Sequence, residues 1–251
     1  MKVLFIGDVY GKPGRTILLE QLDNLKNEYK PNLIVVNAEN SSNNGRGITK
    51  SFYKQLMSAG VSCVTMGNHV WGNNELLEFI DESHIVRPAN FYNAPGKGYD
   101  IIRYNDKTLL VINLLGRTYM NANLENPFFM AEKIIEEHNA TFSLIDFHAE
   151  ATSEKVALGH YLDGKASAVV GTHTHVPTAD ERQLTGGTLY ITDVGMTGPL
   201  DGVIGVDKKI VVDRFLYGHS RPNEVAETKN QLNAVILDFE KKTIKRINVI
   251  Q

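Results

Sequence analysis

Short apolar runs recur along the first half of the chain, and each of them ends in polar residues. These runs are VLFIGDV at residues 3–9, LIVVNAEN at residues 33–40 and VSCVTMGNH at residues 61–69. A short apolar run bounded by polar and turn residues is typical of a buried strand. Residues 16–29 and 51–60 lie between the runs and carry apolar positions at helical spacing, and residues 74–82 are expected to form a further helix. This alternation predicts parallel strands joined by helical crossovers.

The second half of the chain adds antiparallel strands to this pattern. Residues 99–116, 182–194 and 233–250 each read as two strands joined by a tight turn. Further helices are expected at residues 127–140 and 153–164, and further strands at residues 141–150 and from residue 168 onward. We therefore expect an α/β fold with two mixed sheets packed face to face and helices outside each sheet. Because no repeat, low-complexity tract or linker interrupts the pattern, we expect a single domain over residues 1–251.

Composition and charge argue against several classes of function. Of the 251 residues, 42% are hydrophobic and 22% are charged, and the net charge of −3 does not favour a stable complex with nucleic acid. No apolar run approaches the length of a membrane span, and the amino terminus lacks the apolar core of a signal peptide. The single cysteine, Cys63, lies in an apolar segment and is expected to pack as a small hydrophobic residue. These features predict a cytoplasmic protein without membrane contact, and they leave a homo-oligomer open.

Candidate metal ligands stand at the carboxyl ends of five expected parallel strands. They are Asp8, Glu39, Asn40, Asn68, His148, His173 and His175, with His69 next to Asn68. In open α/β sheets, functional groups gather at this edge. His173 and His175 are two residues apart, so their side chains would leave on the same face if the strand stayed extended. A mixture of carboxylate, amide and imidazole suits first-row divalent ions such as manganese, iron or zinc.

The number of donors exceeds what one ion requires. Seven oxygen and nitrogen donors, with one carboxylate able to bridge, fit two ions about 3.5–4 Å apart. Such a pair clamps a phosphate, lowers the pKa of a shared water and supports in-line attack of the resulting hydroxide on phosphorus. Two dications set against Asp8 and Glu39 leave excess positive charge, so an anionic substrate is favoured.

The motifs GDVYG, NAEN, GNH and GTHTH, together with the isolated His148, resemble the ordered motif set of calcineurin-like metallophosphoesterases. More narrowly, the chain is similar to the bacterial YmdB-type phosphodiesterases, which act on cyclic nucleotides. The likeness covers almost the whole length and includes GRTYM at 116–120, DFHAEATSEK at 146–155 and DVGMTGP at 193–199. It implies a four-layer α/β/β/α sandwich and a phosphodiesterase that hydrolyses small phosphodiesters, above all 2′,3′-cyclic nucleoside monophosphates.

The resemblance also implies a role for each candidate residue. Glu39 would bridge the two ions. The remaining ligands would be Asp8, Asn40 and His175 for the first ion, and Asn68, His148 and His173 for the second. His69 resembles the proton donor to the leaving oxygen, a role that suits imidazole because its unperturbed pKa lies near neutrality.

Two departures from the broad superfamily pattern bear on the metal. The usual Asp-x-His of the first strand is here Asp8-Val9-Tyr10, so one histidine ligand is missing and Asn40 is expected to replace it. The usual bridging aspartate is here Glu39, which is one methylene longer. Fewer imidazoles at the first site weaken a preference for zinc, and we expect iron or manganese.

Arg46, in the loop NNGRG, and Arg117, after an apolar run, are candidate contacts to a phosphate or a base. Each is equally consistent with a solvated loop arginine. The remaining histidines are expected to be surface or packing residues: His84, His138, His160 and His219. Two other functions stay open at this point. One is a phosphomonoesterase, including a protein phosphatase, and the other is a regulatory protein that senses a nucleotide or metal and would have no need of His69.

Overall fold

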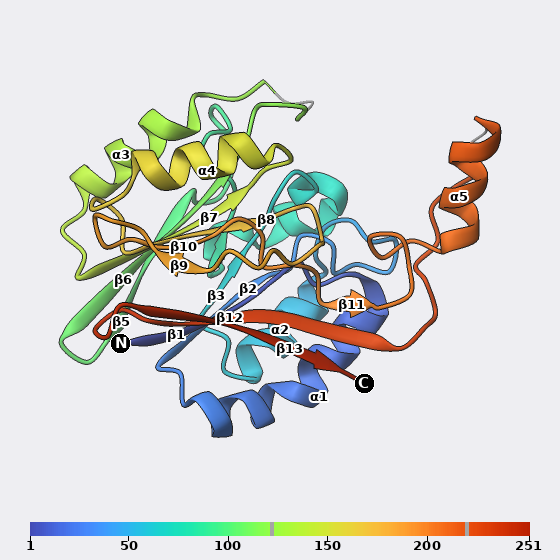
Figure 1. Cartoon of the computed structure of the whole chain (residues 1–251), viewed down its shortest axis with the longest axis horizontal. Helices are drawn as coiled ribbons and strands as arrows, with labels where there is room; N and C mark the ends of the chain where they lie inside the picture. Colours follow the sequence, from blue (N-terminus) through green and yellow to red (C-terminus); the bar gives the residue numbers. More distant parts are fainter. Residues whose placement is uncertain (121–122, 219–220) are drawn as a thin grey trace.

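Two β-sheets pack face to face, and helices cover the outer face of each sheet (Figure 1). The computed structural model describes residues 1–120, 123–218 and 221–251. Its layers run helix, sheet, sheet, helix, which confirms the four-layer α/β/β/α arrangement predicted from the sequence.

The first sheet has seven strands in the order β11-β12-β1-β2-β3-β4, with β13 paired to β12. Its parallel part consists of β1 (Lys2–Ile6), β2 (Leu33–Asn37), β3 (Cys63–Thr65) and β4 (Ile85–Val86). The antiparallel part consists of β11 (Gly198–Pro199), β12 (Asn230–Asp238) and β13 (Thr243–Ile250). Helices α1 (Gly11–Tyr29) and α2 (Lys50–Ser58) make the crossovers between the first three strands.

The second sheet has six strands in the order β5-β6-β7-β8-β10-β9. Its central strands are parallel: β6 (Lys107–Leu115), β7 (Phe142–His148), β8 (Ala168–Thr172) and β10 (Leu189–Ile191). The edge strands β5 (Tyr99–Tyr104) and β9 (Arg182–Gln183) are antiparallel to their neighbours. Helices α3 (Pro127–Glu137) and α4 (Thr152–Tyr161) pack on the outer face.

Strand β1 shows why the sequence has continuous apolar runs rather than alternating ones. Val3 and Phe5 belong to the apolar layer between the sheets, while Leu4 and Ile6 pack against α1 and α2. A strand that is buried on both faces has no polar face to show in the sequence. Cys63 lies in the same inner layer and is fully buried, as its apolar surroundings predict.

The hairpins predicted at residues 99–116, 182–194 and 233–250 are confirmed as β5–β6, β9–β10 and β12–β13. The helix predicted at residues 74–82 is wrong, because the segment forms two short 3-10 helices, η2 (Asn74–Glu78) and η3 (Ile80–Glu82). Phe79 between them has a φ of −142°, which interrupts the helical backbone while Leu76 and Ile80 stay buried on either side. So short a segment gains little from helix propagation, and burial of its apolar side chains decides the backbone.

Helix α5 (Lys208–Tyr217) was not predicted and projects from the body of the molecule (Figure 1). Asp207 caps its amino end, and Gly218 ends it in the left-handed conformation. Among the described residues, no helix combines the length and the apolar character that crossing a membrane requires.

Candidate metal centre

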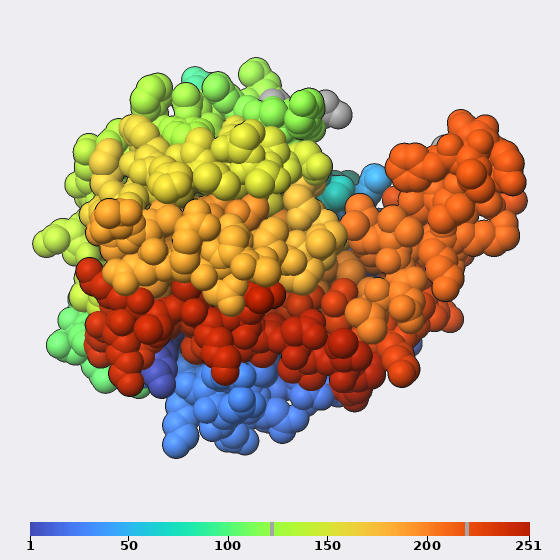
Figure 2. Space-filling model, viewed as in Figure 1, coloured from blue at the N-terminus to red at the C-terminus, as the bar shows by residue number. Residues whose placement is uncertain are grey.

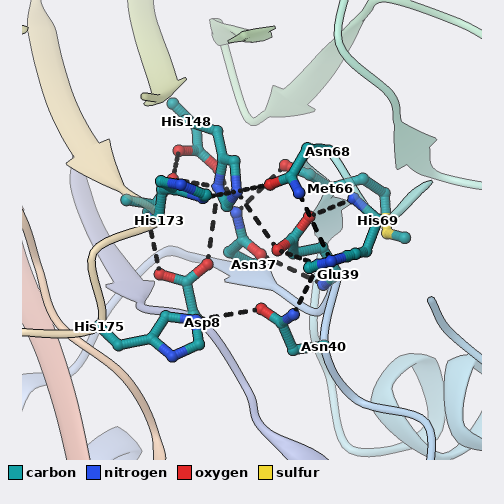
Figure 3. Close-up of polar contacts among 12 residues, drawn as sticks. Asp8, Asn37, Glu39, Asn40, Met66, Asn68, His69, His148, His173 and His175 are labelled. Carbon is teal, nitrogen blue, oxygen red and sulfur yellow. Dashed lines mark hydrogen bonds and ion pairs between the residues drawn. The ribbon is translucent and has the colours of Figure 1, made fainter. Parts of the chain in front are cut away.

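The carboxyl ends of β1, β2, β3, β7 and β8 meet at one edge of the two packed sheets (Figure 3). All seven candidate ligands lie there: Asp8, Glu39, Asn40, Asn68, His148, His173 and His175. The structure therefore brings together side chains from both sheets that are up to 167 positions apart, since Asp8 and His175 belong to the same cluster.

Four of these donors surround one point. The Nε2 atom of His148 lies 2.9 Å from Oδ1 of Asn68, 3.0 Å from Nδ1 of His173 and 3.3 Å from Oε1 of Glu39. Ligand atoms that bind one ion at about 2.1 Å and at right angles to each other lie about 3 Å apart. The spacing of these donors therefore fits a single bound ion, and ligand atoms of Glu39, His148 and His173 all lie within 4.8 Å of one another.

The remaining donors lie beside this group and include a carboxylate oxygen without a hydrogen bond to any described residue, 3.6 Å from Nδ1 of His148. Nε2 of His175 is 3.3 Å from Oδ1 of Asn40, whose amide nitrogen donates to the carbonyl of Gly45. Oδ2 of Asp8 accepts from the backbone N–H of His173, while its Oδ1 is buried without a hydrogen-bond partner among the described residues. A buried carboxylate oxygen without a donor needs a cation to offset its lost hydration. The chemistry of these remaining donors therefore fits a metal ion.

The tautomer of His148 is set by a hydrogen-bond chain on the far side of its ring. Nδ1 of His148 lies 2.9 Å from the hydroxyl of Thr172, and that hydroxyl donates to Oδ1 of Asp146 at 2.7 Å. Because the hydroxyl proton is directed to Asp146, the oxygen of Thr172 accepts from Nδ1–H. Nε2 is then the nitrogen that can bind a metal.

The other two histidines are oriented in the same way. Nε2 of His173 lies 3.0 Å from the carboxylate of Glu150, so Nδ1 faces the donor cluster. Nδ1 of His175 lies 2.8 Å from the carbonyl oxygen of Ile204, which can only accept, so Nε2 of His175 faces the cluster. Each of the three imidazoles therefore has an acceptor on its outer nitrogen, an arrangement typical of metal-binding histidines.

The pKa shifts show that a positive charge is favoured among these groups. Burial alone would raise the pKa of Glu39, but His148 and His69 hold it well below its usual range. Burial would lower the pKa of His148, yet Glu39 and Asp8 raise it to about 9. Burial and the neighbouring His148 lower the pKa of His173 to about 3. The carboxylates thus stabilise one cationic group between them, and a dication would supply that charge at the same place.

Gly67 leaves the space that an ion would need. A Cβ atom at this position would lie 2.5 Å from Nε2 of His148 and closer still to Oε2 of Glu39. Only glycine therefore permits Asn68 and the third strand to approach the cluster so closely.

The loop after β8 departs from the extended geometry considered for GTHTH. The strand ends at Thr172, and His173 and His175 have φ values of 99° and 67°. Thr174 between them donates its N–H and its hydroxyl to Oδ2 of Asp193. The two histidines reach the cluster through a left-handed turn rather than through strand periodicity.

Several supporting residues were missed at the sequence level although they lie in or near the quoted motifs. Lys155 closes DFHAEATSEK, Asp193 opens DVGMTGP, and their side chains form a buried ion pair of 2.6 Å. Glu150 lies in DFHAEATSEK as well. Only Ile204 stands outside any motif, and a β-branched residue before Gly205 gave no signal of its function.

His69 lies beside the cluster and faces the cavity in front of it. Its backbone N–H donates to Oε2 of Glu39 at 2.8 Å, and its Nδ1 lies 3.0 Å from the amide nitrogen of Asn40. Nδ1 also lies 3.2 Å from Oε1 of Glu39, so it stands between an amide donor and a carboxylate acceptor. The side chain is 31% exposed and therefore accessible to a substrate.

The cavity has a volume of about 870 Å³ and places the two candidate arginines differently. Arg46 lines it, whereas Arg117 is not among the described residues that do. Arg117 is exposed, and its backbone N–H donates to Glu154. Of the other histidines, His84 is exposed beside Asp100 and His138 packs against Tyr99, while His219 lies outside the described residues.

Comparison with known proteins gives relatives along the whole chain. A family model described as YmdB-like protein matches residues 4–251. A Bacillus subtilis protein named 2′,3′-cyclic-nucleotide 2′-phosphodiesterase is 48% identical, over 99% of this chain and 95% of that protein. Among solved structures, a hypothetical protein from Thermus thermophilus is 40% identical with a TM-score of 0.95, over the full length of both chains. A structure described as a novel phosphatase from Mycoplasma pneumoniae is 37% identical with a TM-score of 0.94, over 100% of this chain and 93% of that one.

Proposed function

The chain belongs to the YmdB-like protein family, as its motifs predict, and we propose that it is a metal-dependent phosphodiesterase acting on 2′,3′-cyclic nucleoside monophosphates. The observation that carries this proposal is the convergence of seven donors at one edge of the sheets, among them a buried oxygen of Asp8 that has no hydrogen bond to the described residues. The substrate follows from the name of the Bacillus subtilis relative.

Two ions of iron or manganese would occupy the centre. Glu39 would bridge them, and the other ligands would be Asp8, Asn40 and His175 for one ion and Asn68, His148 and His173 for the other. When bound, such ions hold the phosphate and make a water molecule nucleophilic near neutral pH.

The protein's own groups account for orientation and for the departing oxygen. Addition of water to phosphorus breaks the bond to the 2′ oxygen and leaves a nucleoside 3′-phosphate. The 2′ oxygen departs as an alkoxide and needs a proton, which His69 would deliver. Arg46 lines the same cavity and would contact the phosphate or the base.

The function is tested with purified protein loaded with iron or with manganese and analysed for metal content. We expect hydrolysis of adenosine 2′,3′-cyclic phosphate, and faster hydrolysis of bis-p-nitrophenyl phosphate than of p-nitrophenyl phosphate. A preference for the monoester would indicate a phosphomonoesterase instead. Nucleotide binding without turnover by fully loaded protein would indicate a regulatory protein. A metal content of at most one ion per active chain would exclude the dinuclear centre.

His69 and Asn68 are neighbours with different proposed roles, so their alanine variants separate proton transfer from metal binding. His69→Ala should keep both metals and lose about 10²–10⁴-fold in turnover of the cyclic nucleotide. Its loss on an aryl diester should be smaller, because p-nitrophenolate leaves without protonation. Asn68→Ala should instead reduce metal content and activity on both substrates. Loss of metal from His69→Ala would make His69 a ligand rather than a proton donor.

Three further predictions from the sequence stay predictions. They are a single domain over residues 1–251, a cytoplasmic location without membrane contact, and the absence of a stable complex with nucleic acid. A homo-oligomer stays open.

A further inference from the structure

The cavity extends well beyond the metal centre. Its volume of about 870 Å³ is near the upper end of the range of about 300–1,000 Å³ that is typical of small-molecule sites. Four of the seven candidate ligands line its inner end, while its outer wall comes from the loop that carries Arg46 and from the segment around α5. Figure 2 shows the hollow between the projecting α5 segment and the body of the molecule.

The outer wall is basic. Arg46, Arg214 and Arg221 all line the cavity. Among the described residues that line it, the carboxylates are Glu39, a candidate metal ligand, and Glu150, which holds His173. The acidic groups are thus confined to the metal centre, and the outer wall presents guanidinium groups, which bind phosphate through paired hydrogen bonds.

Hydrogen bonds hold the guanidinium of Arg214 in place and leave its Nε–H without an acceptor among the described residues. Its Nη2 donates to Oδ1 of Asn223 at 2.6 Å and to the carbonyl of Arg221 at 3.2 Å. Its Nε is buried and has no hydrogen-bond partner among the described residues. A buried donor without a partner is unfavourable unless a ligand supplies the acceptor.

Ile204 places an apolar surface on the same cavity at the expense of backbone strain. Its φ is 46°, which a β-branched residue rarely adopts, and its side chain is 52% exposed. The turn is closed by two hydrogen bonds between Val203 and Val206, and the carbonyl of Ile204 accepts from His175. Strain that persists at a cavity wall is typical of a functional position. An exposed isoleucine here can pack against a ribose or a base.

We propose that the outer wall of the cavity is a second phosphate site, made by Arg214 and Arg221 together with Arg46. The preferred substrates are then ribonucleotides that carry another phosphate on the 5′ side of the nucleoside with the cyclic phosphate. This inference rests on the proposed function, and it widens the substrate class from mononucleoside cyclic phosphates to 5′-phosphorylated nucleotides and short RNA ends.

The test compares substrates whose scissile groups are identical. The three substrates are adenosine 2′,3′-cyclic phosphate, its 5′-phosphorylated form, and a diadenosine dinucleotide that ends in the same cyclic phosphate. Charge-assisted hydrogen bonds contribute enough to predict kcat/KM about 10- to 100-fold higher for a substrate with the second phosphate. The advantage should shrink as salt is raised, because partly exposed charges are screened. A higher kcat/KM for the 5′-phosphorylated nucleotide alone would identify free nucleotides as the substrate class. A higher kcat/KM for the dinucleotide as well would extend the class to RNA ends.

Variants then tie the preference to the arginines. Arg214→Gln should reduce the kcat/KM ratio of phosphorylated to unphosphorylated substrate toward 1. The matched control is Arg103→Gln, an exposed arginine on β5 outside the cavity, which should keep the wild-type ratio. If Arg214→Gln unfolds, the salt dependence of the wild-type ratio decides the question. A wild-type ratio near 1 with efficient hydrolysis of the mononucleotide overturns the second site and leaves the proposed function intact. Failure of the metal-loaded enzyme on all three substrates overturns the proposed function, and the second site with it.

Discussion

Lys155 on α4 and Asp193 after β10 form an ion pair next to the turn that carries two of the candidate metal ligands. Each side chain is 1% exposed, and Nζ of Lys155 is 2.6 Å from Oδ2 of Asp193. The same Oδ2 accepts from the N–H of Thr174 at 3.1 Å and from its hydroxyl at 2.8 Å. Because Thr174 stands between His173 and His175, the pair fixes the turn that brings both histidines to the cluster.

Replacement of Lys155 by methionine keeps the apolar stem and removes only the charge. Asp193 would then be a buried carboxylate without its cation, and breaking a buried pair in this way costs about 3–5 kcal/mol. The donors that remain on Asp193, from Thr174 and Gly195, satisfy part of its hydrogen-bonding capacity, so we expect a loss of about 3 kcal/mol. The double variant Lys155→Met with Asp193→Asn should regain part of that loss, because asparagine keeps an acceptor and carries no charge.

The free energy of unfolding is measured by urea denaturation of the metal-free protein, and the affinity for manganese is titrated in parallel. Lys165→Met provides the control, because Lys165 pairs with Glu132 at the surface with side chains 46% and 28% exposed. Such surface pairs contribute about 0–1 kcal/mol. If Lys155→Met loses no more stability than Lys165→Met and binds manganese as tightly as wild type, the reasoning about the buried pair is refuted.

Three other substitutions probe the space at Gly67, the strained turn at Ile204 and the surface carboxylate of Glu240. Gly67→Ala should lower the metal content measured by elemental analysis, because the added Cβ would collide with His148. A full metal content would show that the space at Gly67 is not needed for metal binding. Ile204→Asn should raise the free energy of unfolding by about 1 kcal/mol, since asparagine tolerates positive φ. It should also raise KM for the cyclic nucleotide, because the apolar contact with the substrate is lost. A lower KM would contradict that contact. The hydrogen bond from Lys107 lowers the pKa of Glu240 from 4.5 to about 2, so its stabilising effect is complete above pH 4.5 and vanishes as the pH falls through 2. Glu240→Gln and wild type should therefore converge in unfolding free energy over that interval, and an NMR titration that gives a pKa near 4.5 would refute the shift.

The clustering of the candidate ligands could be predicted because their position depends on a rule that the sequence displays. Strands buried on both faces give continuous apolar runs, and a carboxylate follows two positions after the end of β1 and of β2, at Asp8 and Glu39. Once parallel strands are inferred, these ends must lie at one edge. The backbone at His173 and His175 could not be predicted in this way. Their left-handed turn depends on Asp193, eighteen or more positions later in the chain, and such a pairing leaves no local signal.

The α5 segment could not be predicted from the hydrophobic pattern. Asp207 and Gly218 are ordinary signals for the ends of a helix, but no apolar stripe connects them, because Phe215 and Leu216 are 85% and 66% exposed. A helix that contributes little to the core is not recorded in the hydrophobic pattern, although Arg214 on this helix faces the cavity. The candidate metal ligands therefore stand where the fold is most constrained, at strand ends inside the packed layers. Under the proposed second phosphate site, selection among phosphodiesters would depend on this projecting segment together with the loop that carries Arg46.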